Sequence, residues 1–492
     1  MKGPYNVLYV SSEVAPFAKT GGLADVAGAL PKAIKELGHD IRVMMPKYGF
    51  ISDRKYTLRE VIRLKDVHVQ LGDREYTISA KSAFLPDSKV QIYFIEYPPY
   101  FDRESPYVNP KTGKDWEDNA ERFALFSRGV LEVLRVLHWQ PDVIHCNDWQ
   151  TALIPTYLKT VLKDDNYFAK TSTLLTIHNL AYQGVFDPGV LEAIGLPQEL
   201  FSPGGPVEFY GKVNFLKAGI VYADLLNTVS ERYAQEIQTP EYGAGLDGVL
   251  RERAQDLYGI LNGVDYSVWN PETDELIPHH YNASDLSGKW KNKEALLEQL
   301  GLPYAEDVPV IGMISRLADQ KGFDLLAEII DDLMALDIRF VLLGTGDPKY
   351  HKIFERVGKK YKNKASINLR FDNPLAHLIE AGSDMFLMPS RYEPCGLNQI
   401  YSLKYGTIPI VRATGGLADT IKDFDPATGK GNGFVFEKYD AGELLATIER
   451  ALEVYKDKKN WLKLIRNAMA EDFSWSVSAK KYVDLYKKLV RR

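Results

Sequence analysis

Cysteine is scarce in this sequence. The 492 residues include only two, Cys146 and Cys395, which lie about 250 positions apart. So low a count excludes a scaffold held by disulfides, and it provides no CxxC pair for zinc or redox chemistry. The sequence also has no GxSxG, HExxH or EF-hand motif. One Asp-x-Asp pair, Asp423 and Asp425, precedes a loop and is interpreted as loop solvation, so we expect neither a metal nor another cofactor.

Long apolar runs are missing as well. No stretch of about 18 apolar residues occurs, so the sequence predicts neither a membrane-spanning helix nor a membrane partner. The opening residues, MKGPYNVLYVSSEVAPF, lack both the apolar core of a signal peptide and the Arg- and Ser-rich composition of a transit segment. We therefore expect the protein in the cytoplasm.

An excess of positive charge is the third absence. Lys and Arg number 60 against 66 Asp and Glu, which leaves a formal net charge of −6, and no basic block stands out. Proteins that bind nucleic acid usually carry a basic domain, so nucleic acid is not an expected partner. The hydrophobic fraction of 45% is typical of a folded globular chain. At roughly 100–200 residues per domain, the length predicts two or three domains.

What the sequence does contain is a repeated alternation of strand-like and helix-like segments. Asn6–Val10 is an apolar run typical of a buried strand, apolar residues recur at helical spacing from Leu23 to Leu37, and Ile41–Met45 is the next strand. This β-α-β order predicts a parallel sheet covered by helices. Further strands are predicted at Val143–His145, Ser172–Ile177, Val308–Ser315, Ile338–Leu343, Met385–Met388, Ile408–Val411 and Gly433–Phe436, and helices at Thr151–Leu162 and Trp475–Val490.

Two α/β series of similar size predict two Rossmann-like domains. We place an amino-terminal domain at residues 1–257, a carboxy-terminal domain at 258–472 and a carboxy-terminal helix at 473–492. Tyr258–Asp265 is predicted to be a short strand followed by an Asn262-Gly263 turn, the expected hinge, and Asn270–Lys293 is predicted to be irregular. Because open α/β sheets bind ligands at the carboxyl ends of their strands, we expect the active site in the cleft between the domains.

A glycine-rich turn follows the first predicted strand. In Lys19–Leu23 two glycines precede a helix, where backbone N–H groups and the helix N-terminus attract anions, and Lys19 adds a full charge. The spacing is neither that of a dinucleotide fold nor that of a P-loop, and a Gly-Gly turn alone is more often structural. The hexapeptide Thr20–Asp25 recurs at Thr414–Asp419, which indicates either a shared role or two turns of similar geometry.

Two cations follow the first strand of the second series. Arg316 and Lys321 belong either to a solvated basic loop or to a site for a diphosphate, and their position after a first strand favours the second interpretation. Further along, Glu393 lies at the carboxyl end of a predicted strand, ahead of Gly396 and Leu397, which would open a helix. Its carboxylate could bind sugar hydroxyls or cap that helix.

Polar clusters also follow two neighbouring strands of the first series. His145–Gln150 and Thr176–Asn179 either line a cleft or serve the structure, since a single histidine is usually structural. Trp149 and Tyr182 could stack on sugar faces or belong to the core.

Taken together, seven motifs resemble the bacterial- and plant-type glycogen and starch synthases, and the resemblance covers nearly the whole chain. It rests on KTGGLADV (19–26), CNDWQTAL (146–153), IHNLAYQG (177–184), NGVD (262–265), SRLADQKG (315–322), EPCGL (393–397) and TGGLADT (414–420). The resemblance implies a GT-B fold, with two Rossmann-like domains facing across a deep cleft. It also implies retaining transfer of glucose from a nucleotide sugar, usually ADP-glucose, to the nonreducing 4-hydroxyl of an α-1,4-glucan.

The same resemblance implies roles for individual residues. Lys19, Arg316 and Lys321 would hold the donor's diphosphate, Glu393 would bind the transferred glucose, and His178 would lie near the reacting carbon. Phe371 would stack on the base at a position where relatives often carry tyrosine. The further substrate-binding residues that it implies are Gly22, Asp25, Asp148, Asn262, Cys395, Gly396, Leu397, Thr414, Gly415 and Gly416.

The expected chemistry needs charge stabilisation more than a nucleophile. Cleavage of the sugar–phosphate bond leaves negative charge on the nucleoside diphosphate, which three cations and helix N-termini can stabilise without a metal. A covalent route would need a carboxylate close to the anomeric carbon. Because the resemblance puts Glu393 beside the outer hydroxyls, we favour same-face substitution with the departing phosphate accepting the proton.

Two other functions are open. One is a different GT-B transferase that uses UDP-glucose, such as a sucrose synthase-like enzyme. Those enzymes commonly carry a second glutamate eight residues after Glu393, where this chain has Tyr401. The other is a noncatalytic glucan-binding protein, which the presence of Lys19, Arg316 and Glu393 disfavours.

Overall fold

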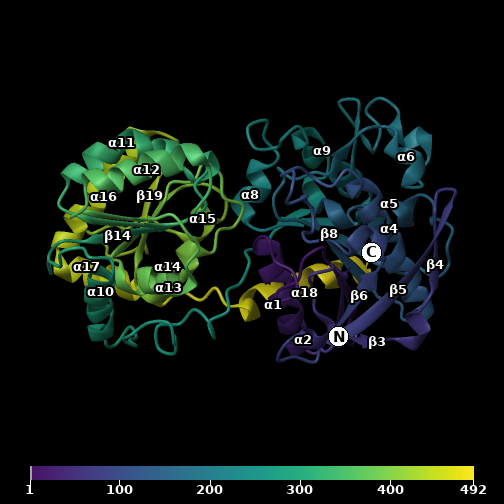
Figure 1. Ribbon diagram of the computed structural model, residues 1–492, viewed down its shortest axis with the longest axis horizontal. Coiled ribbons are helices and arrows are strands. Elements are labelled where there is room, and N and C mark those ends of the chain that lie inside the picture. The colour runs from purple at the N-terminus through teal and green to yellow at the C-terminus, as the bar shows by residue number, and fades with distance from the viewer. Residues whose placement is uncertain (1–2, 492) are drawn as a thin grey trace. The chain divides into compact units, whose positions relative to one another are not determined.

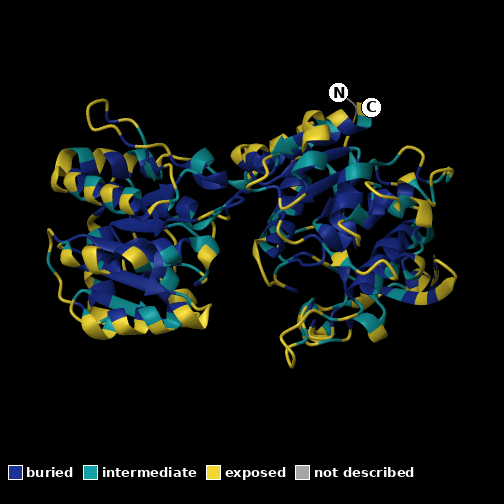
Figure 2. Cartoon of the chain, turned by 90° about the horizontal axis from the view of Figure 1, so that it is seen from above, coloured by how far each residue is buried: buried dark blue, intermediate teal, exposed yellow. Residues whose placement is uncertain are grey.

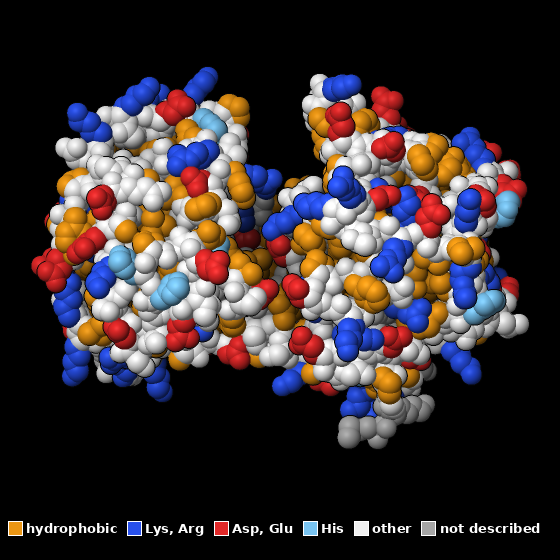
Figure 3. All heavy atoms as spheres, turned by 60° about the horizontal axis from the view of Figure 1, so that its bottom comes forward, with side chains coloured by type: hydrophobic (Ala, Val, Ile, Leu, Met, Phe, Trp, Pro, Cys, Tyr) orange, Lys and Arg blue, Asp and Glu red, His pale blue; other side chains and the backbone are white. Residues whose placement is uncertain are grey.

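The computed structural model describes residues 3–491, which form two compact units (Figure 1). Unit 1 comprises residues 3–229, 234–263 and 475–491, and unit 2 comprises 230–233 and 264–474. In both units the strands lie in the interior and the helices turn an exposed face outward (Figure 2). Basic and acidic side chains are interspersed over the surface that Figure 3 draws.

Unit 1 is built on a mostly parallel sheet with the strand order β13-β12-β8-β7-β1-β2-β6-β5-β3. The chain starts in the middle, at β1, so the direction of winding reverses between β1 and β7. The strands are β1 Asn6–Val10, β2 Asp40–Pro46, β3 Arg59–Glu60, β4 Val67–Leu71 (paired with β5), β5 Arg74–Phe84, β6 Gln91–Glu96, β7 Val143–Asn147, β8 Ser172–Ile177, β12 Leu225–Thr228 and β13 Leu257–Gly259. A small second sheet contains β9 Val185–Phe186, β10 Glu208–Phe209 and β11 Lys212–Asn214.

The helices of unit 1 cover this sheet. They are α1 Gly22–Glu36, α2 Asp53–Tyr56, α3 Pro98–Phe101, α4 Asn119–Leu137, α5 Leu153–Lys159, α6 Val190–Ala193, α7 Phe215–Tyr222, α9 Asp247–Glu252 and α18 Trp475–Arg491, with α8 Glu231–Glu236 at the boundary of the units. Short 3-10 turns lie at η1 Ile62–Leu64, η2 Trp149–Thr151, η3 Gln198–Phe201 and η4 Ala254–Asp256. Helix α18 lies beside α1 (Figure 1), and its Tyr486 hydroxyl is 2.8 Å from His145 Nδ1 at the centre of the sheet.

Unit 2 is a fully parallel, doubly wound sheet with the order β16-β15-β14-β17-β18-β19, so its direction reverses between β14 and β17. Helices α11, α12 and α16 cover one face, and α10, α13, α14 and α17 cover the other (Figure 1). The strands are β14 Val310–Ile314, β15 Arg339–Leu343, β16 Ala365–Asn368, β17 Met385–Met388, β18 Ile408–Arg412 and β19 Phe434–Phe436. The helices are α10 Ser287–Gln299, η5 Asp319–Lys321, α11 Phe323–Ala335, α12 Pro348–Lys360, α13 Asn373–Gly382, α14 Asn398–Tyr405, α15 Gly415–Thr420, α16 Ala441–Lys456 and α17 Lys458–Met469.

Two local predictions are wrong. Asn262 and Gly263 form no turn, because the chain here continues irregularly out of β13, and Gly263 is small to admit Trp475: a Cβ at this glycine would lie 2.6 Å from Trp475 Cα. The stretch predicted to be irregular contains the start of α10. That helix carries two buried lysines, Lys289 and Lys293, within the stretch predicted to be irregular.

Both lysines are buried because protein acceptors satisfy them. Lys289 Nζ donates to the carbonyls of Ala381 and Ser383 and to Thr407 Oγ1, and burial lowers its pKa to about 7. Lys293 Nζ lies 2.8 Å from Asp384 Oδ2. The predicted helix Thr151–Leu162 is also shorter than expected, since residues 149–151 form a 3-10 turn before α5. In the described part of the chain, no helix combines the length and apolarity that crossing a membrane requires.

Candidate active site

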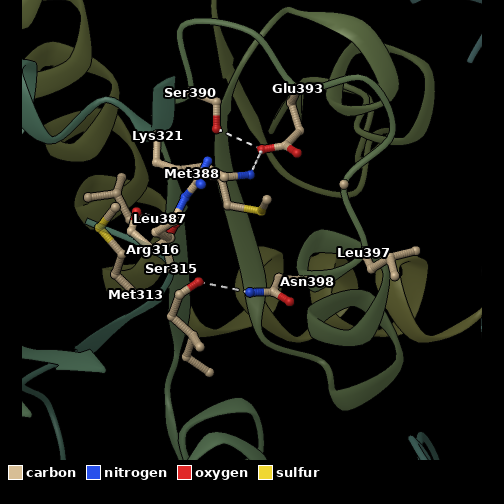
Figure 4. A pocket seen from close by; sticks show the side chains of 12 residues that line it. Met313, Ser315, Arg316, Lys321, Leu387, Met388, Ser390, Glu393, Leu397 and Asn398 are labelled. Atoms are coloured by element: carbon tan, nitrogen blue, oxygen red, sulfur yellow. Dashed lines mark hydrogen bonds and ion pairs between the residues drawn. The ribbon is translucent and has the colours of Figure 1, made fainter. Parts of the chain in front are cut away.

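A pocket of unit 2 lies where β14 and β17 end, at the reversal point of the sheet (Figure 4). Adjacent parallel strands that lead away in opposite directions leave a crevice at their carboxyl ends, which is the usual ligand site of such sheets. The polar residues that line it are Ser315, Arg316, Lys321, Ser390, Glu393 and Asn398. The two segments predicted to carry chemistry, 315–322 and 393–397, thus meet in one pocket.

An ion pair occupies the wall of this pocket. Lys321 Nζ lies 2.6 Å from Glu393 Oε2, and the Ser390 hydroxyl donates to the same oxygen at 3.1 Å (Figure 4). The side chains of Lys321 and Glu393 are 22% and 8% exposed, so the carboxylate is largely withdrawn from water. A carboxylate with these two donors is held in one orientation.

The loop that follows Glu393 leads into α14. Gly396 has φ +72°, and a Cβ there would lie 2.6 Å from Gln399 Oε1, so the turn requires glycine. Asn398 Nδ2 donates to the Ile314 carbonyl at 2.8 Å and ties the start of α14 to the end of β14. Gly396 and Leu397 line the pocket just before the first turn of α14, whose N–H groups precede the helical hydrogen bonds. Cys395 is buried between them and Glu393.

Arg316 is the exposed cation of the pocket. Its Nη2 donates to Gln320 Oε1 at 3.2 Å, so an uncharged amide orients the guanidinium. The loop behind it turns at Gly322, with φ +79°, and a Cβ there would lie 2.0 Å from the Pro389 carbonyl oxygen. This close approach brings Lys321 to the Glu393 loop.

The second TGGLAD segment packs behind Glu393. A Cβ on Gly415 would lie 1.8 Å from the Glu393 carbonyl oxygen, and one on Gly416 would lie 1.9 Å from the Cys395 carbonyl oxygen. The Gly416 N–H donates to Glu393 O at 3.1 Å, and Thr414 is fully buried. In this conformation the two glycines therefore support the Glu393 loop.

Phe371 stands apart from these residues. It follows β16, two strands away from β14, and its side chain is 89% exposed. The neighbouring Arg370 pairs with Asp372 at 2.9 Å, and Asp372 caps α13. The ring is thus exposed to solvent on the side of the sheet where the carboxyl ends of the strands lie, which is also the side of the pocket.

In unit 1 the KTGG loop follows β1. Lys19 Nζ lies 2.7 Å from Asp25 Oδ1, with both side chains substantially exposed. Thr20 donates its N–H and its hydroxyl to the buried carboxylate of Glu13, which also accepts from the Tyr107 hydroxyl at 2.7 Å. Glu13 therefore fixes the residue next to Lys19.

Gly22, the first residue of α1, differs from its counterpart Gly416. It is exposed, and a Cβ there would meet nothing within 4 Å. None of the described residues requires a glycine at this position, so the open space in front of α1 is available to a ligand.

His178 and Asp148 form a second polar group, where β7 and β8 end. The Asp148 carboxylate accepts a hydrogen bond from the backbone N–H of His178 at 2.7 Å, and the ring nitrogen His178 Nε2 lies 2.9 Å from Asn147 Oδ1. Burial lowers the pKa of His178 to about 3, whereas burial, together with the Glu13 carboxylate, raises the pKa of Asp148 to about 7. Asp148 also has φ +57°, a strained conformation of the kind that concentrates at functional sites.

The remaining candidates of unit 1 divide between surface and core. Asn262 is buried, and its Oδ1 has no hydrogen-bond partner among the described residues. Trp149 belongs to the core, where its ring contacts Phe123 at 5.1 Å, and Tyr182 is 57% exposed. Within residues 3–491, no group of three or more His, Cys, Asp or Glu side chains is placed to hold a metal.

Sequence reasoning missed several residues that shape the site. Glu13 lies three positions past the end of β1, and this location at a strand's carboxyl end is a signal that could have found it. Asn147 lies inside a quoted segment and Ser390 two residues after a predicted strand, but neither is assigned a role from sequence. Tyr107 reaches Glu13 from a loop 94 residues away, and no local pattern marks it.

Comparison with known proteins decides the family. Residues 6–252 match the model described as the starch synthase catalytic domain, and residues 298–468 match glycosyl transferases group 1. Glycogen synthase of Thermotoga maritima is 50% identical over 99% of both chains, and that of Koribacter versatilis is 50% identical over 98% of both. The chain belongs to the glycogen and starch synthase family. The predicted activity, glucosyl transfer to a glucan by a glycosyltransferase, is thereby confirmed.

Solved structures agree with this family assignment. The catalytic domain of starch synthase IV from Arabidopsis thaliana, described as bound to ADP and acarbose, is 35% identical, covers both chains completely and has a TM-score of 0.89. Sucrose-phosphate synthase from Thermosynechococcus elongatus shares the fold alone, at 17% identity over 99% of both chains and a TM-score of 0.58. The predicted GT-B fold, with two parallel-sheet domains and a carboxy-terminal helix, is confirmed.

Proposed function

We propose that this family member is a cytoplasmic glycogen synthase that transfers glucose from ADP-glucose to the nonreducing 4-hydroxyl of an α-1,4-glucan, with retention and without a cofactor. The observation that carries the proposal is the pocket at the end of β14 and β17, where Arg316, Lys321 and Glu393 converge. The similar starch synthase IV structure is described as bound to ADP and acarbose, which supports a nucleoside diphosphate and a glucan as ligands.

In unit 2, Arg316 and Lys321 would neutralise the donor's diphosphate. Arg316 suits this role because a guanidinium binds phosphate oxygens in bidentate fashion and, among the described residues, a neutral amide is its hydrogen-bond partner. Glu393 would accept hydrogen bonds from the glucose, next to the N–H groups of Cys395, Gly396 and Leu397 at the start of α14.

The outer parts of the donor would meet other residues of unit 2. Phe371 would offer its exposed ring to the base. Thr414, Gly415 and Gly416 would act on the donor chiefly by supporting the Glu393 loop, since Gly416 already donates its N–H to Glu393 O.

In unit 1, Lys19 would bind the same diphosphate, and Gly22 would leave room for the ligand. Asp25 would orient the Lys19 ammonium until the diphosphate binds. His178 and Asp148 would contact the glucose. Asn262 would join them, because its buried Oδ1 has no hydrogen-bond partner among the described residues and so remains able to accept a hydrogen bond.

The chemical step would be a same-face substitution. The bond between the anomeric carbon and the phosphate oxygen breaks, the electron pair leaves with the nucleoside diphosphate, and the acceptor's 4-hydroxyl attacks from the same side while its proton passes to the departing phosphate. Glu393 is engaged by Lys321 and Ser390, which suits a residue that orients sugar hydroxyls better than a free nucleophile.

A sucrose synthase-like alternative has less support. Those enzymes commonly carry a glutamate at the position of Tyr401, whereas here the Tyr401 ring stacks on Trp269 with 4.1 Å between ring centroids. Hydrophobic packing therefore occupies the place of that second carboxylate.

The deciding experiment offers labelled ADP-glucose or UDP-glucose and a glycogen primer to the purified protein in EDTA. We expect release of ADP and labelled glucan, and we expect Arg316→Ala and Glu393→Gln to reduce turnover by about 10²–10³. Lys360→Ala serves as control, because Lys360, the last residue of α12, forms an exposed ion pair with Asp331 on α11. Transfer from UDP-glucose alone would refute ADP-glucose as the donor. If both site variants turned over at the rate of the control variant, the assignment of the pocket as the active site would be refuted.

A further inference from the structure

The last residue of β7, Asn147, holds the imidazole of His178. Asn147 is completely buried, and its Oδ1 lies 2.9 Å from His178 Nε2 and 3.0 Å from the Tyr9 hydroxyl. Its Nδ2 donates to the Val10 carbonyl at 2.9 Å and faces the His145 carbonyl at 3.4 Å. Every polar atom of this amide side chain thus has a protein partner.

The arrangement determines which way the amide points. Carbonyl oxygens only accept hydrogen bonds, so the atom that faces Val10 O and His145 O must be the NH₂ group. Oδ1 then faces Tyr9 and His178 and must accept from both. An acceptor opposite His178 Nε2 requires a hydrogen on that nitrogen, because two acceptors would repel.

We propose that Asn147 is a positioning residue that fixes His178 as the Nε2–H tautomer and leaves Nδ1 as an acceptor for a hydroxyl group of the sugar. The proposal rests on the proposed place of His178 in the glucose site. It adds a definite polarity to that place: the ring accepts a hydrogen bond from the ligand and does not donate one.

The charges around the ring fit a neutral imidazole. The titratable side chains near the ring are those of Asp148, Glu13, His145 and Tyr9. The Asp148 carboxylate accepts a hydrogen bond from the backbone N–H of His178, and Glu13 lies beside Asp148. His145 is on β7 and Tyr9 on β1. Burial raises the pKa of Asp148 and lowers that of His178. An amide at position 147 adds no charge to this group, whereas a carboxylate there would favour the imidazolium and so protonate Nδ1.

The tautomer can be measured on the unaltered protein. With ¹⁵N-labelled histidine, the long-range ¹H–¹⁵N correlations of His178, assigned by comparison with His178→Gln, should show a protonated Nε2 and an unprotonated Nδ1 at pH 7. The Nδ1–H tautomer or an imidazolium at pH 7 would overturn the proposal. This measurement does not depend on transfer activity, so its failure is distinct from failure of the proposed function.

Kinetics then test the consequence for the sugar. In Asn147→Asp we expect the acidic limb of the kcat/KM profile to move upward by about 1–3 pH units, because the new carboxylate raises the pKa of His178. In Asn147→Leu, which removes the acceptor at similar size, we expect kcat/KM to fall by about tenfold, equivalent to one hydrogen bond.

Tyr9→Phe is the matched control. It removes the other donor to the same oxygen, so it should lower the melting temperature while leaving the His178 tautomer and the pH profile unchanged. A folded Asn147→Asp protein with the unaltered profile, or an equal shift in Tyr9→Phe, would show that Asn147 serves packing alone. Should Asn147→Asp fail to fold, the tautomer measurement still decides.

Discussion

At the scale of single residues, the two lysines of the candidate site are already paired with carboxylates of the same site. Lys19 pairs with Asp25 at 2.7 Å, and Lys321 pairs with Glu393 at 2.6 Å. A bound diphosphate would compete for both ammonium groups. Each carboxylate thus keeps its lysine oriented before the ligand arrives, and a preorganised charge stabilises a transition state without rearrangement.

Lys19 should therefore be essential for turnover but not for folding. Lys19→Ala removes one preorganised positive charge, and we expect a loss of about 10²–10³ in kcat, equivalent to ~3–4 kcal/mol. Steady-state assays with ADP-glucose measure the effect. Lys35→Ala, which breaks the ion pair with Asp40 at the other end of α1, is the control and should retain full activity. Equal activity of the two variants would contradict the role of Lys19.

A buried histidine should make stability depend on pH. His145 lies between Tyr486 and Thr176, and burial lowers its pKa to about 3 from the ordinary 6.5. Between those values the unfolded chain binds a proton that the folded one does not, so the stability contributed by neutral His145 is lost as the pH falls below 6.5. At pH 5 this group should cost about 2 kcal/mol of unfolding free energy.

Urea unfolding at pH 7 and pH 5 measures that loss. We expect His145→Gln to show a smaller decrease between the two pH values than the unaltered protein. Other groups that titrate in this range contribute equally to both proteins, so the difference isolates His145. Identical decreases would contradict the assignment.

At the scale of elements, the two TGGLAD copies show that one sequence can serve two physical roles. Both copies lie between a strand and a helix. In the first, Gly22 is exposed and has open space in front of it, whereas in the second Gly415 and Gly416 press against the carbonyls of Glu393 and Cys395. The repeated glycines leave open space in the first copy, where we propose that a ligand binds, and allow close approach of the protein's own loop in the second.

Matched alanine substitutions should separate the two roles. Gly22→Ala should leave the melting temperature unchanged or slightly raised, since alanine favours the helix, while raising KM for the donor about tenfold. Gly416→Ala should destabilise unit 2 by several kcal/mol, because its Cβ would lie 1.9 Å from Cys395 O. Thermal unfolding and donor titrations measure both. A destabilised Gly22→Ala or an unaffected Gly416→Ala would contradict this division.

The elements also show which strands and helices can be predicted from local sequence. Ser172–Ile177 and Met385–Met388 are predicted with their observed bounds, because buried strands of a parallel sheet are apolar runs bounded by polar residues. Asn262-Gly263 is mispredicted, because the glycine there serves contact with Trp475, far along the chain. The start of α10 is hidden because its buried lysines find their acceptors in distant segments.

The residues of the candidate site likewise divide into those that local sequence identifies and those that it does not. Residues inside glycine-rich or charged motifs, such as Lys19, Arg316 and Glu393, can be found from sequence because their chemistry is local. Asn147 cannot, since its role arises only when strands separated in the chain pair side by side: Asn147 meets Tyr9 across 138 residues. The family resemblance supplied the remaining assignments.

At the scale of the whole molecule, the two units differ in how the chain builds them. Unit 2 takes most of its residues from one segment, 264–474, whereas unit 1 needs α18 in addition to its earlier segments. Tyr482, Tyr486 and Leu489 of α18 are buried, and Ser478 donates to the Leu261 carbonyl at 2.7 Å. Helix α18 is thus an integral part of the core of unit 1.

Removal of α18 should accordingly harm unit 1 and spare unit 2. In a chain shortened to residues 1–474, we expect amide exchange to increase by orders of magnitude in β1, β7 and β8 and to stay unchanged in β14 and β17. Val477→Ala, at a 40% exposed position of α18, is the control and should exchange like the unaltered protein. Uniform protection in the shortened chain would contradict the packing role of α18.

That dependence sets an order of events at the ribosome. When translation has passed residue 263, the sheet of unit 1 still has an uncovered strip around His145 where α18 will lie. The strip stays open while some 200 further residues, which form most of unit 2, are added. Unit 1 is thus completed by its latest-made helix, and a nascent chain stalled before Trp475 leaves that strip uncovered.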